Sequence, residues 1–363
     1  MLKVCITYDY ELFLGKNNAS YDEILFSPTE EIIKAMTAGG ARGTFFADVC
    51  SATEHKKAGL YEYSEKFGEQ LKTLTRAGHD VQLHLHTSWL RAQKKDGKLI
   101  PTADGYRIHE FGFDPKEEIC AQKIITESKE YLEKICGEVK PNYKCIAFRA
   151  GGFCIQPERE LIKALTESGI VLDSSVVPYL KSPDSVNYYD FSSVPDKLNW
   201  SIGGSGGISK DSGKIENSLY EIPVASLRPR LPEYIGKPKN KRSLPQSKIK
   251  GEYVSFSDGG NTRREGFAER LFKRLFGYRY ISLDTRYYER VLDDLHYIYR
   301  KYGLSERDGY VCLICHPKLA DRARVENIKY LIEAVNREQD KLRFVTFTDI
   351  YNELFINCRQ EEK

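Results

Sequence analysis

The chain has 363 residues, enough for one large domain or two modest ones with a full core. Hydrophobic residues make up 41% and charged residues 29%, and no apolar stretch approaches the roughly 18 residues that a membrane span needs. The net charge of +3 is too small to indicate nucleic acid binding. The nine cysteines are scattered and the first residues show no export signal, so we expect free thiols in a reducing cytoplasm.

Strands and helices alternate along most of the chain. The patterns predict strands over 2–8, 43–47, 80–86, 143–148, 170–172, 310–315 and 343–347. They predict helices over 28–38, 62–77, 116–136, 157–168, 286–302 and 321–337. This alternation implies a parallel sheet with helices outside it, as in a (β/α) barrel of the α/β class.

The alternation stops between about 186 and 284. A strand is predicted at 220–224, and 228–250 is rich in Pro, Lys and Arg, with Glu233 as its only acid. Segment 266–277 could form an amphipathic helix that either packs on the barrel or lies on a membrane surface. We expect one domain over 1–363, with 186–284 as an elaborating insertion.

Two carboxylates follow the first predicted strand. Asp9 and Glu11 are two residues apart, so the alternation of a strand sends both side chains to one side. One could bind a metal ion while the other acts as a base, although a solvated pair at a turn would look the same. In a barrel, such strand ends open onto the face that carries the chemistry.

Two histidines end the strand at 80–86. His84 and His86 share a face, and two imidazoles with one carboxylate form a typical three-ligand zinc site that leaves a position for water. His79 begins this strand, at the wrong end for chemistry, and is expected to be structural.

Polar residues end three more strands. Arg149 could pair with Asp9 and keep it ionised, while Gly151 and Gly152 would let the backbone approach a ligand closely. Asp173 could orient a histidine or cap a turn. His316 follows an apolar strand and precedes a proline, which places it at the mouth of a barrel.

The order of these segments resembles the polysaccharide deacetylases of carbohydrate esterase family four, whose fold is a distorted, incomplete barrel of about seven strands. The resemblance covers roughly 1–180 and 285–355. The matching segments are 7–10 (Thr-Tyr-Asp-Tyr), 43–46 (Gly-Thr-Phe-Phe), 78–81 (Gly-His-Asp-Val), 148–152 (Phe-Arg-Ala-Gly-Gly), 173–175 (Asp-Ser-Ser), and Leu313 with His316.

Two positions depart from the family pattern. The family's second aspartate, a metal ligand, is Tyr10 here, and its second metal histidine is Ser88. Glu11 and His86 are the obvious replacements. The metal site could therefore consist of Glu11, His84 and His86, or Asp9 itself could bind the metal, or the site could have lost metal and activity.

The resemblance implies hydrolysis of an N-acyl group, most often N-acetyl, from an amino sugar, with one divalent metal ion, zinc being the best match. It implies that Asp9 is the base, that Arg149 orients it and that His316 is the acid. Asp173 would support the acid, and Leu313 would line the acyl pocket. The expected substrate is a nucleotide-linked or lipid-linked saccharide precursor, reached through membrane contact by 228–276. The alternatives are a non-catalytic saccharide-binding protein and a hydrolase of a non-sugar amide.

Overall fold

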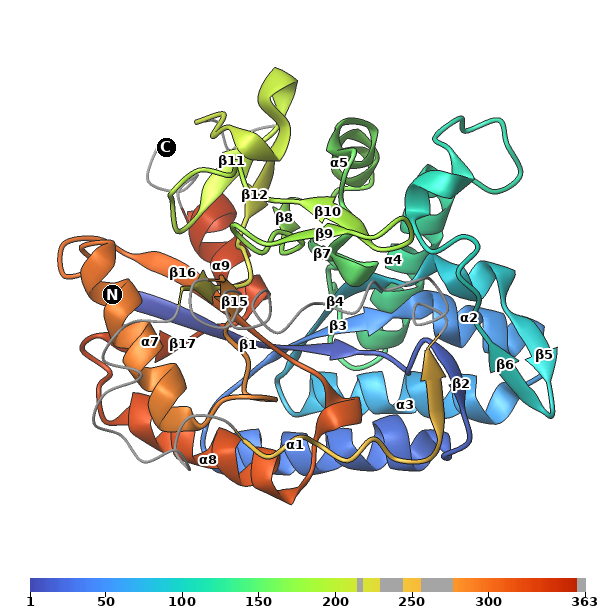
Figure 1. The fold of residues 1–363 in the computed structure, drawn as a ribbon, viewed down its shortest axis with the longest axis horizontal. Coiled ribbons are helices and arrows are strands. Elements are labelled where there is room, and N and C mark those ends of the chain that lie inside the picture. The colour runs from blue at the N-terminus through green and yellow to red at the C-terminus, as the bar shows by residue number, and fades with distance from the viewer. Residues whose placement is uncertain (214–217, 229–243, 256–276, 358–363) are drawn as a thin grey trace.

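The fold is seen in a computed structural model that describes residues 1–213, 218–228, 244–255 and 277–357. In these residues a nine-stranded sheet forms the centre of the fold (Figure 1). The strand order is β11-β12-β8-β7-β4-β3-β1-β16, and β17 pairs with β1 beside this path. The strands are β1 (Leu2–Tyr10), β3 (Thr44–Asp48), β4 (Asp80–Leu85), β7 (Ala147–Ala150), β8 (Leu172–Asp173), β11 (Trp200–Ile202), β12 (Leu219–Glu221), β16 (Gly309–Cys315) and β17 (Leu342–Phe344).

The sheet is curled into an incomplete barrel. The seven strands from β12 to β16 run parallel, whereas β11 is antiparallel to β12. On the open side, an isolated parallel bridge joins Val224 to Cys312, and the Ala225 N–H donates to the Cys312 carbonyl at 2.9 Å. This architecture confirms the predicted fold class, a distorted and incomplete (β/α) barrel.

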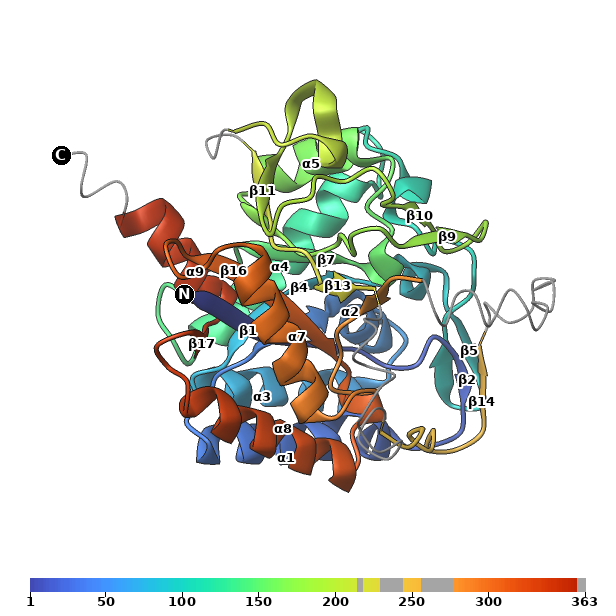
Figure 2. The same ribbon diagram turned by 60° about the vertical axis from the view of Figure 1, so that its left-hand side comes forward.

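Helices cover the outside of the sheet, as Figures 1 and 2 show. The chain forms them where apolar residues recur at helical spacing: α3 buries Tyr63, Phe67, Leu71 and Leu74 along one stripe. Contacts link α1 with α8, α8 with α7, α2 with α3, α3 with α4, and α4 with α5. The helices are α1 (Ser27–Ala38), α2 (Val49–Lys57), α3 (Tyr61–Arg76), α4 (Ala121–Gly137), α5 (Glu158–Glu167), α7 (Tyr288–Lys301), α8 (Arg322–Asn336) and α9 (Phe347–Tyr351).

In the part of the chain that the structure describes, four small two-stranded sheets lie around the barrel. They pair β2 with β14, β5 with β6, β9 with β10, and β13 with β15. Their strands are β2 (Gly15–Asn17), β5 (Gln93–Lys95), β6 (Lys98–Ile100), β9 (Lys181–Pro183), β10 (Tyr188–Asp190), β13 (Ser226–Leu227), β14 (Tyr253–Ser255) and β15 (Arg279–Tyr280).

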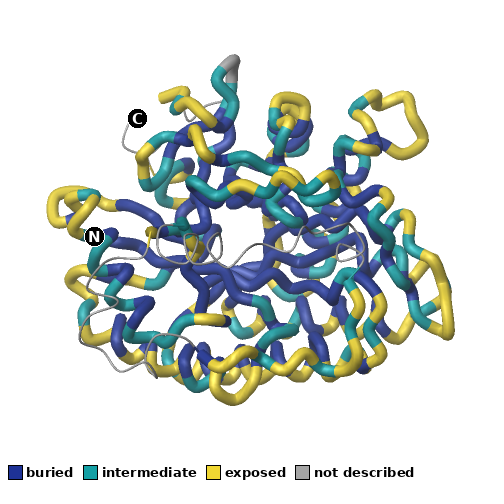
Figure 3. The backbone as a smooth tube through the Cα atoms, in the orientation of Figure 1, coloured by how far each residue is buried: buried dark blue, intermediate teal, exposed yellow. Residues whose placement is uncertain are grey.

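The buried residues follow the central sheet, seen as the dark blue tube in Figure 3. Every residue of β1, β3, β4, β7 and β16 is buried, as expected for parallel strands covered on both faces. Among the described residues, no helix is both long and apolar enough to cross a membrane.

The main differences from the sequence predictions lie at element ends. The last strand stops at Phe344, and Phe347 begins α9 instead of ending that strand. The Thr346 hydroxyl accepts from the Asp349 N–H, a capping box that starts the helix and stops the strand. Helix α4 begins at Ala121 rather than at 116, and β7 begins at Ala147 rather than at 143. Helix α2 was not predicted.

Candidate active site

Asp9 and Glu11 point to the same side of β1, as their spacing predicted. Both are almost completely buried. Tyr10, between them, points the other way: its hydroxyl donates to Gln70 Oε1 at 2.7 Å, and its ring packs against Phe67. The residue at the family's second aspartate position is therefore a core side chain here, and Glu11 supplies the second carboxylate of the site.

Glu11 brings together the two strand-end histidines. Its Oε2 contacts His86 Nε2 and lies 3.3 Å from His84 Nε2. The three ligand atoms lie within 4.8 Å of one another. Burial acts to raise the pKa of Glu11, but Lys318 and the two imidazoles outweigh it and hold that pKa well below its usual range.

The hydrogen bond on the far side of His84 fixes which nitrogen faces Glu11. His84 Nδ1 lies 2.8 Å from the Arg149 carbonyl oxygen, which can only accept, so Nδ1 carries the proton. A neutral His84 then presents the lone pair of Nε2 to a carboxylate. This arrangement requires a proton or a cation between the two atoms. Burial opposes protonation of His84, but Asp9 and Glu11 outweigh it and raise its pKa above the usual value. A divalent metal ion in place of that proton fits the same donor set.

Arg149 holds Asp9 from inside the barrel. Its guanidinium contacts Asp9 Oδ1, and its other N–H groups donate to the Ser174 carbonyl at 3.1 Å, Ser174 Oγ at 3.0 Å and Cys312 Sγ at 3.0 Å. Burial opposes the ionisation of Asp9, but Arg149, His84 and His316 more than compensate and lower the pKa of this carboxyl. Asp9 is thus an oriented, ionised carboxylate.

His316 reaches the same cluster from β16. Its Nε2 lies 3.8 Å from Asp9 Oδ2 and 3.8 Å from Glu11 Oε1. Its Nδ1 lies 2.9 Å from Asp284 Oδ2. Burial acts to lower the pKa of His316, but Asp284 and Asp9 outweigh it and raise that pKa above its usual value. Asp9, Glu11 and His316 form a second set whose ligand atoms lie within 4.8 Å of one another.

Asp173 occupies a different position from the one expected. Its carboxylate accepts from the Ser175 N–H at 2.9 Å and the Ser175 hydroxyl at 2.8 Å, and it pairs with Glu221. The carboxylate in contact with His316 is Asp284, so the structure does not bring Asp173 to the acid as the motif order suggested.

Leu313 lies on the opposite face of β16 from His316. Consecutive strand residues point to opposite faces, and Cys312 contacts Arg149 inside the barrel. The fully buried Leu313 therefore faces outward, whereas Ile314 shares the face of Cys312 and His316. A strand residue three positions before His316 points to the opposite face, so the Leu313 side chain does not face the site.

The two glycines after β7 permit close packing at the site. A Cβ on Gly151 would clash with the Leu85 carbonyl oxygen and lie 2.8 Å from His86 Nδ1. Gly152 has φ of +56°, and a Cβ there would clash with the Tyr106 hydroxyl. Gly151 therefore leaves room for His86 in its observed orientation.

Three polar residues of the site were missed from the sequence: Asp48, Asp284 and Lys318. Asp48 ends β3, and its Oδ1 accepts from the His86 N–H at 3.1 Å. Lys318 lies two residues after His316, and its ammonium donates to Glu11 Oε1 at 2.6 Å. Asp48 carried a signal, because an acid ends an apolar strand there as at Asp9. Lys318 and Asp284 lie in irregular segments outside the predicted strands, so the sequence carried no comparable signal for them.

The other predicted features lie apart from this cluster or outside the described residues. His79 is buried at the start of β4, where its Nδ1 accepts from the Gly43 N–H at 3.1 Å, in keeping with a structural role. The eight cysteines that the structure describes are free and buried. Most of the basic stretch 228–250, and nearly all of the proposed helix 266–277, lie outside the described residues.

No protein-family model matches the sequence, and no curated protein matches it. Solved structures match over nearly the whole chain. A Parabacteroides distasonis protein assigned as a glycoside hydrolase/deacetylase has 12% identity and a TM-score of 0.53, covering 98% of this chain and 71% of that one. Puue allantoinase has 14% identity and a TM-score of 0.49, covering 98% of this chain and 90% of the other.

A Mycobacterium smegmatis protein assigned as a polysaccharide deacetylase has 14% identity and a TM-score of 0.46, covering 99% of this chain and 91% of that one. At such low identities the likeness concerns the fold alone, and the Parabacteroides structure carries it. The chain therefore shares the fold of a structure assigned as a glycoside hydrolase/deacetylase, as the order of its motifs predicted.

Proposed function

We propose that this chain is a metal-dependent amide hydrolase that removes an N-acyl group, most simply N-acetyl, from an amino sugar. The proposal rests on one cluster at the strand ends. In it, the Glu11 carboxylate lies between His84 and His86, and His316 lies beside the carboxylates of both Asp9 and Glu11. The fold shared with a glycoside hydrolase/deacetylase supports a saccharide amide as the substrate class.

Glu11, His84 and His86 would hold one divalent ion, and zinc suits two imidazoles with a carboxylate. Such an ion would supply Lewis-acid polarisation of the substrate carbonyl. We prefer this set to the one containing Asp9, because Asp9 is held by Arg149, whereas Nε2 of His84 faces Glu11. Glu11 also reaches both imidazoles with a single oxygen.

The chain's own residues would then move the protons. Asp9, kept ionised by Arg149, takes a proton from the water that attacks the amide carbonyl carbon. His316 donates its proton to the nitrogen as the carbon–nitrogen bond breaks, which releases a carboxylic acid and a free amine. Asp284 favours the protonated form of His316 that this step needs. Arg149 and Asp284 act through Asp9 and His316 and are positioning residues.

The test is release of free amine and acetate from N-acetylated oligosaccharides, together with the metal content of protein purified without added metal. We expect about one divalent ion per chain and amine release that a chelator abolishes. Metal-free protein that binds saccharides without hydrolysing them would instead favour a binding protein. Hydrolysis of a cyclic ureide but of no saccharide would favour a non-sugar amide.

We further propose a lipid-linked or nucleotide-linked saccharide precursor as the substrate, met on the cytoplasmic side of the membrane. The basic composition of 228–250 and the apolar and basic residues of 266–277 support a lipid-linked form. Both segments lie largely outside the described residues. Co-sedimentation with anionic vesicles at low salt tests this. Protein that stays in the supernatant would leave a soluble saccharide as the better substrate.

A further inference from the structure

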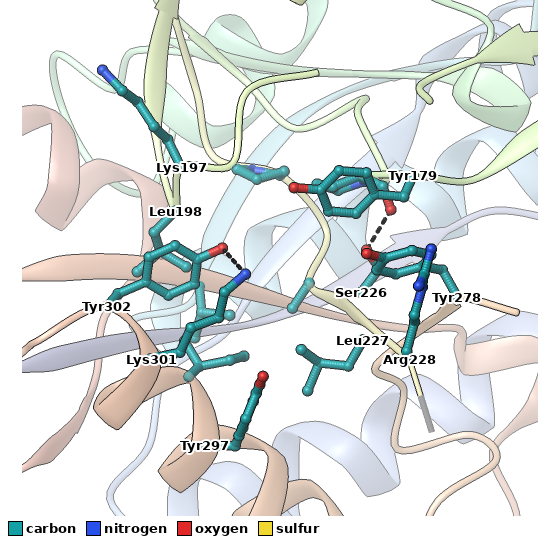
Figure 4. Close-up of a pocket in the computed structure, with 15 residues that line it drawn as sticks. Tyr179, Lys197, Leu198, Ser226, Leu227, Arg228, Tyr278, Tyr297, Lys301 and Tyr302 are labelled. Atoms are coloured by element: carbon teal, nitrogen blue, oxygen red, sulfur yellow. Dashed lines mark hydrogen bonds between the residues drawn. The ribbon is translucent and has the colours of Figure 1, made fainter. Parts of the chain in front are cut away.

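We propose that a cavity on the outer face of β16, apart from the candidate active site, binds an anionic sugar unit without acting on it. The cavity has a volume of about 180 Å³ and lies between the C-terminal part of α7, the chain at 197–198 and strand β13 (Figure 4). This volume suits one sugar ring with a small charged substituent rather than a long chain.

Strand β16 separates this cavity from the candidate active site. Val311 lines the cavity, whereas the next residue, Cys312, contacts Arg149 inside the barrel. Because consecutive strand residues point to opposite faces, the two sites lie on opposite sides of the strand. A ligand in the outer cavity would therefore not contact Asp9 or His316.

The cavity wall combines aromatic and cationic side chains. Among the described residues, the lining includes four tyrosines and three cations but no aspartate or glutamate. These aromatic and cationic residues are Tyr179, Tyr278, Tyr297, Tyr302, Lys197, Arg228 and Lys301. Figure 4 shows the Lys301 ammonium and the Tyr297 hydroxyl directed toward the space enclosed by these side chains. Tyrosines offer an apolar face together with a polar hydroxyl, which matches a sugar ring that has both kinds of surface.

Arg228 is the cation best placed to hold a charged ligand. Lys301 already donates to Asp196 at 2.7 Å, and Lys197 to Asp211 at 2.5 Å. Arg228, by contrast, forms no ion pair with any residue that the structure describes. Its guanidinium stacks over the Tyr278 ring, 4.6 Å from the ring centroid. Within the described part of the chain, no hydrogen bond uses its guanidinium donors. A guanidinium binds a carboxylate or a phosphate in bidentate fashion.

The neighbouring backbone supports a built wall rather than a chance gap. Tyr179 has φ of +66°, in the left-handed region that side chains other than Asn and Asp rarely adopt. Its ring packs on Tyr278 with centroids 4.5 Å apart, and its hydroxyl donates to Asp196 at 3.1 Å. Such backbone conformations persist where surrounding contacts impose them, and they concentrate at ligand-binding sites.

The experiment is a titration of chelator-treated protein with glucuronate and with glucose 1-phosphate, followed by calorimetry and ligand-detected NMR. Glucose and inorganic phosphate serve as single-component probes. We expect both anionic sugars to bind the wild type more tightly than either component alone. The relative affinity of glucuronate and glucose 1-phosphate would show whether a carboxylate or a phosphate is preferred.

Arg228→Gln should weaken this binding by about tenfold or more. Arg322→Gln, which removes an exposed arginine from α8, is the matched control and should leave binding unchanged. Asp9→Asn should also retain binding, so the result does not depend on whether the proposed hydrolase activity is correct. Absence of binding to the wild type, equal binding of inorganic phosphate alone, or equal affinities for the two arginine variants would overturn the proposal.

Discussion

The ammonium of Lys318 lies 2.6 Å from Glu11 Oε1, on the side of that carboxylate away from the two imidazoles. Both side chains are largely buried, with 13% and 6% of their surfaces exposed. One oxygen of Glu11 therefore serves a fixed cation while the other serves His84 and His86. This division fixes the orientation of the carboxylate before any metal ion binds.

Removing that ammonium should destabilise the metal-free protein. Lys318→Met leaves a buried carboxylate with one partner fewer, and we expect the free energy of unfolding to fall by about 1–3 kcal/mol. A divalent ion would offset part of the loss, because it offers Glu11 a new positive partner. Chemical denaturation with a chelator and with zinc measures both effects.

The matched control for this change is Lys34→Met, which removes the exposed partner of Glu31. Exposed ion pairs contribute little to stability, so this variant should unfold at the same denaturant concentration as the wild type under both conditions. An equal loss in the two variants would mean that the Lys318–Glu11 contact has no special role.

If Asp9 is the base and His316 the acid, replacing either residue should remove most of the activity. Asp9→Asn and His316→Ala should each lower turnover by roughly a hundredfold or more, because each removes a group that transfers a proton. The measurement is amine release from an N-acetylated oligosaccharide, with circular dichroism to verify folding. Asp22→Asn and His296→Ala, which alter side chains away from the cluster, should keep full activity. Wild-type rates for Asp9→Asn or His316→Ala would remove that residue from the mechanism.

The contact between His316 and Asp284 predicts a shift in the pH profile. Asp284 raises the pKa of His316, so Asp284→Asn should lower it. A general acid must be protonated, and the alkaline limb of the kcat/KM profile should therefore move to lower pH. Asp173→Asn should leave that limb in place, because Asp173 contacts Ser175 and Glu221 instead. A shift in the Asp173 variant alone would restore the role that the motif order suggested.

Residues at regular strand ends could be located from the sequence. Strands of the β/α alternation end at the site residues. Asp9, His84 and Arg149 are the second-last residues of their strands, and His86 and His316 come directly after theirs. Parallel strands end at one edge of a sheet. That these five side chains lie close together therefore follows from the strand and helix pattern of the sequence and from the parallel arrangement of the strands.

The partners of those residues could not be located in this way. Asp284 comes from the irregular stretch that the alternation does not cover, and the Ile281 N–H donates to the Ala225 carbonyl at 2.7 Å to place that segment beside β16. Motif order indicated Asp173 as the partner of His316 because order along the chain carries no information about side-chain distance. Leu313 was assigned to the wrong face because a motif spacing was given more weight than strand alternation.

The buried carboxyl pair Asp173–Glu221 predicts that replacing Glu221 by a neutral residue stabilises the protein at high pH. Burial and the neighbouring Asp173 raise the pKa of Glu221 well above its usual value. A carboxyl with a raised folded-state pKa contributes stability that is complete below its unfolded pKa, about 4.3, and is lost as the pH rises toward the folded value. Glu221→Gln keeps a donor toward Asp173 without needing a proton.

The Gln variant should therefore be more stable than the wild type at pH 8, by on the order of 1 kcal/mol, and the difference should shrink toward pH 4. Thermal unfolding at several pH values measures it. The exposed Glu62→Gln on α3 is the control and should show no such trend. A Glu221→Gln variant less stable than the wild type at pH 8 would show that the pair is held in a stable charged form.

The close approach of Gly151 to His86 predicts that a side chain at position 151 lowers the metal affinity. In Gly151→Ala, the added Cβ would clash with the Leu85 carbonyl oxygen and with His86 Nδ1, so both the end of β4 and the imidazole must move, and His86 loses its orientation toward Glu11. We expect the dissociation constant for zinc to rise by at least about tenfold, since one of three ligands is displaced. Calorimetric zinc titration measures this without relying on activity. Gly137→Ala on α4 is the matched control, because a Cβ there meets no atom within 4 Å. If the two alanine variants bind zinc equally tightly, His86 is not a ligand, and Asp9, Glu11 and His316 become the set to test next.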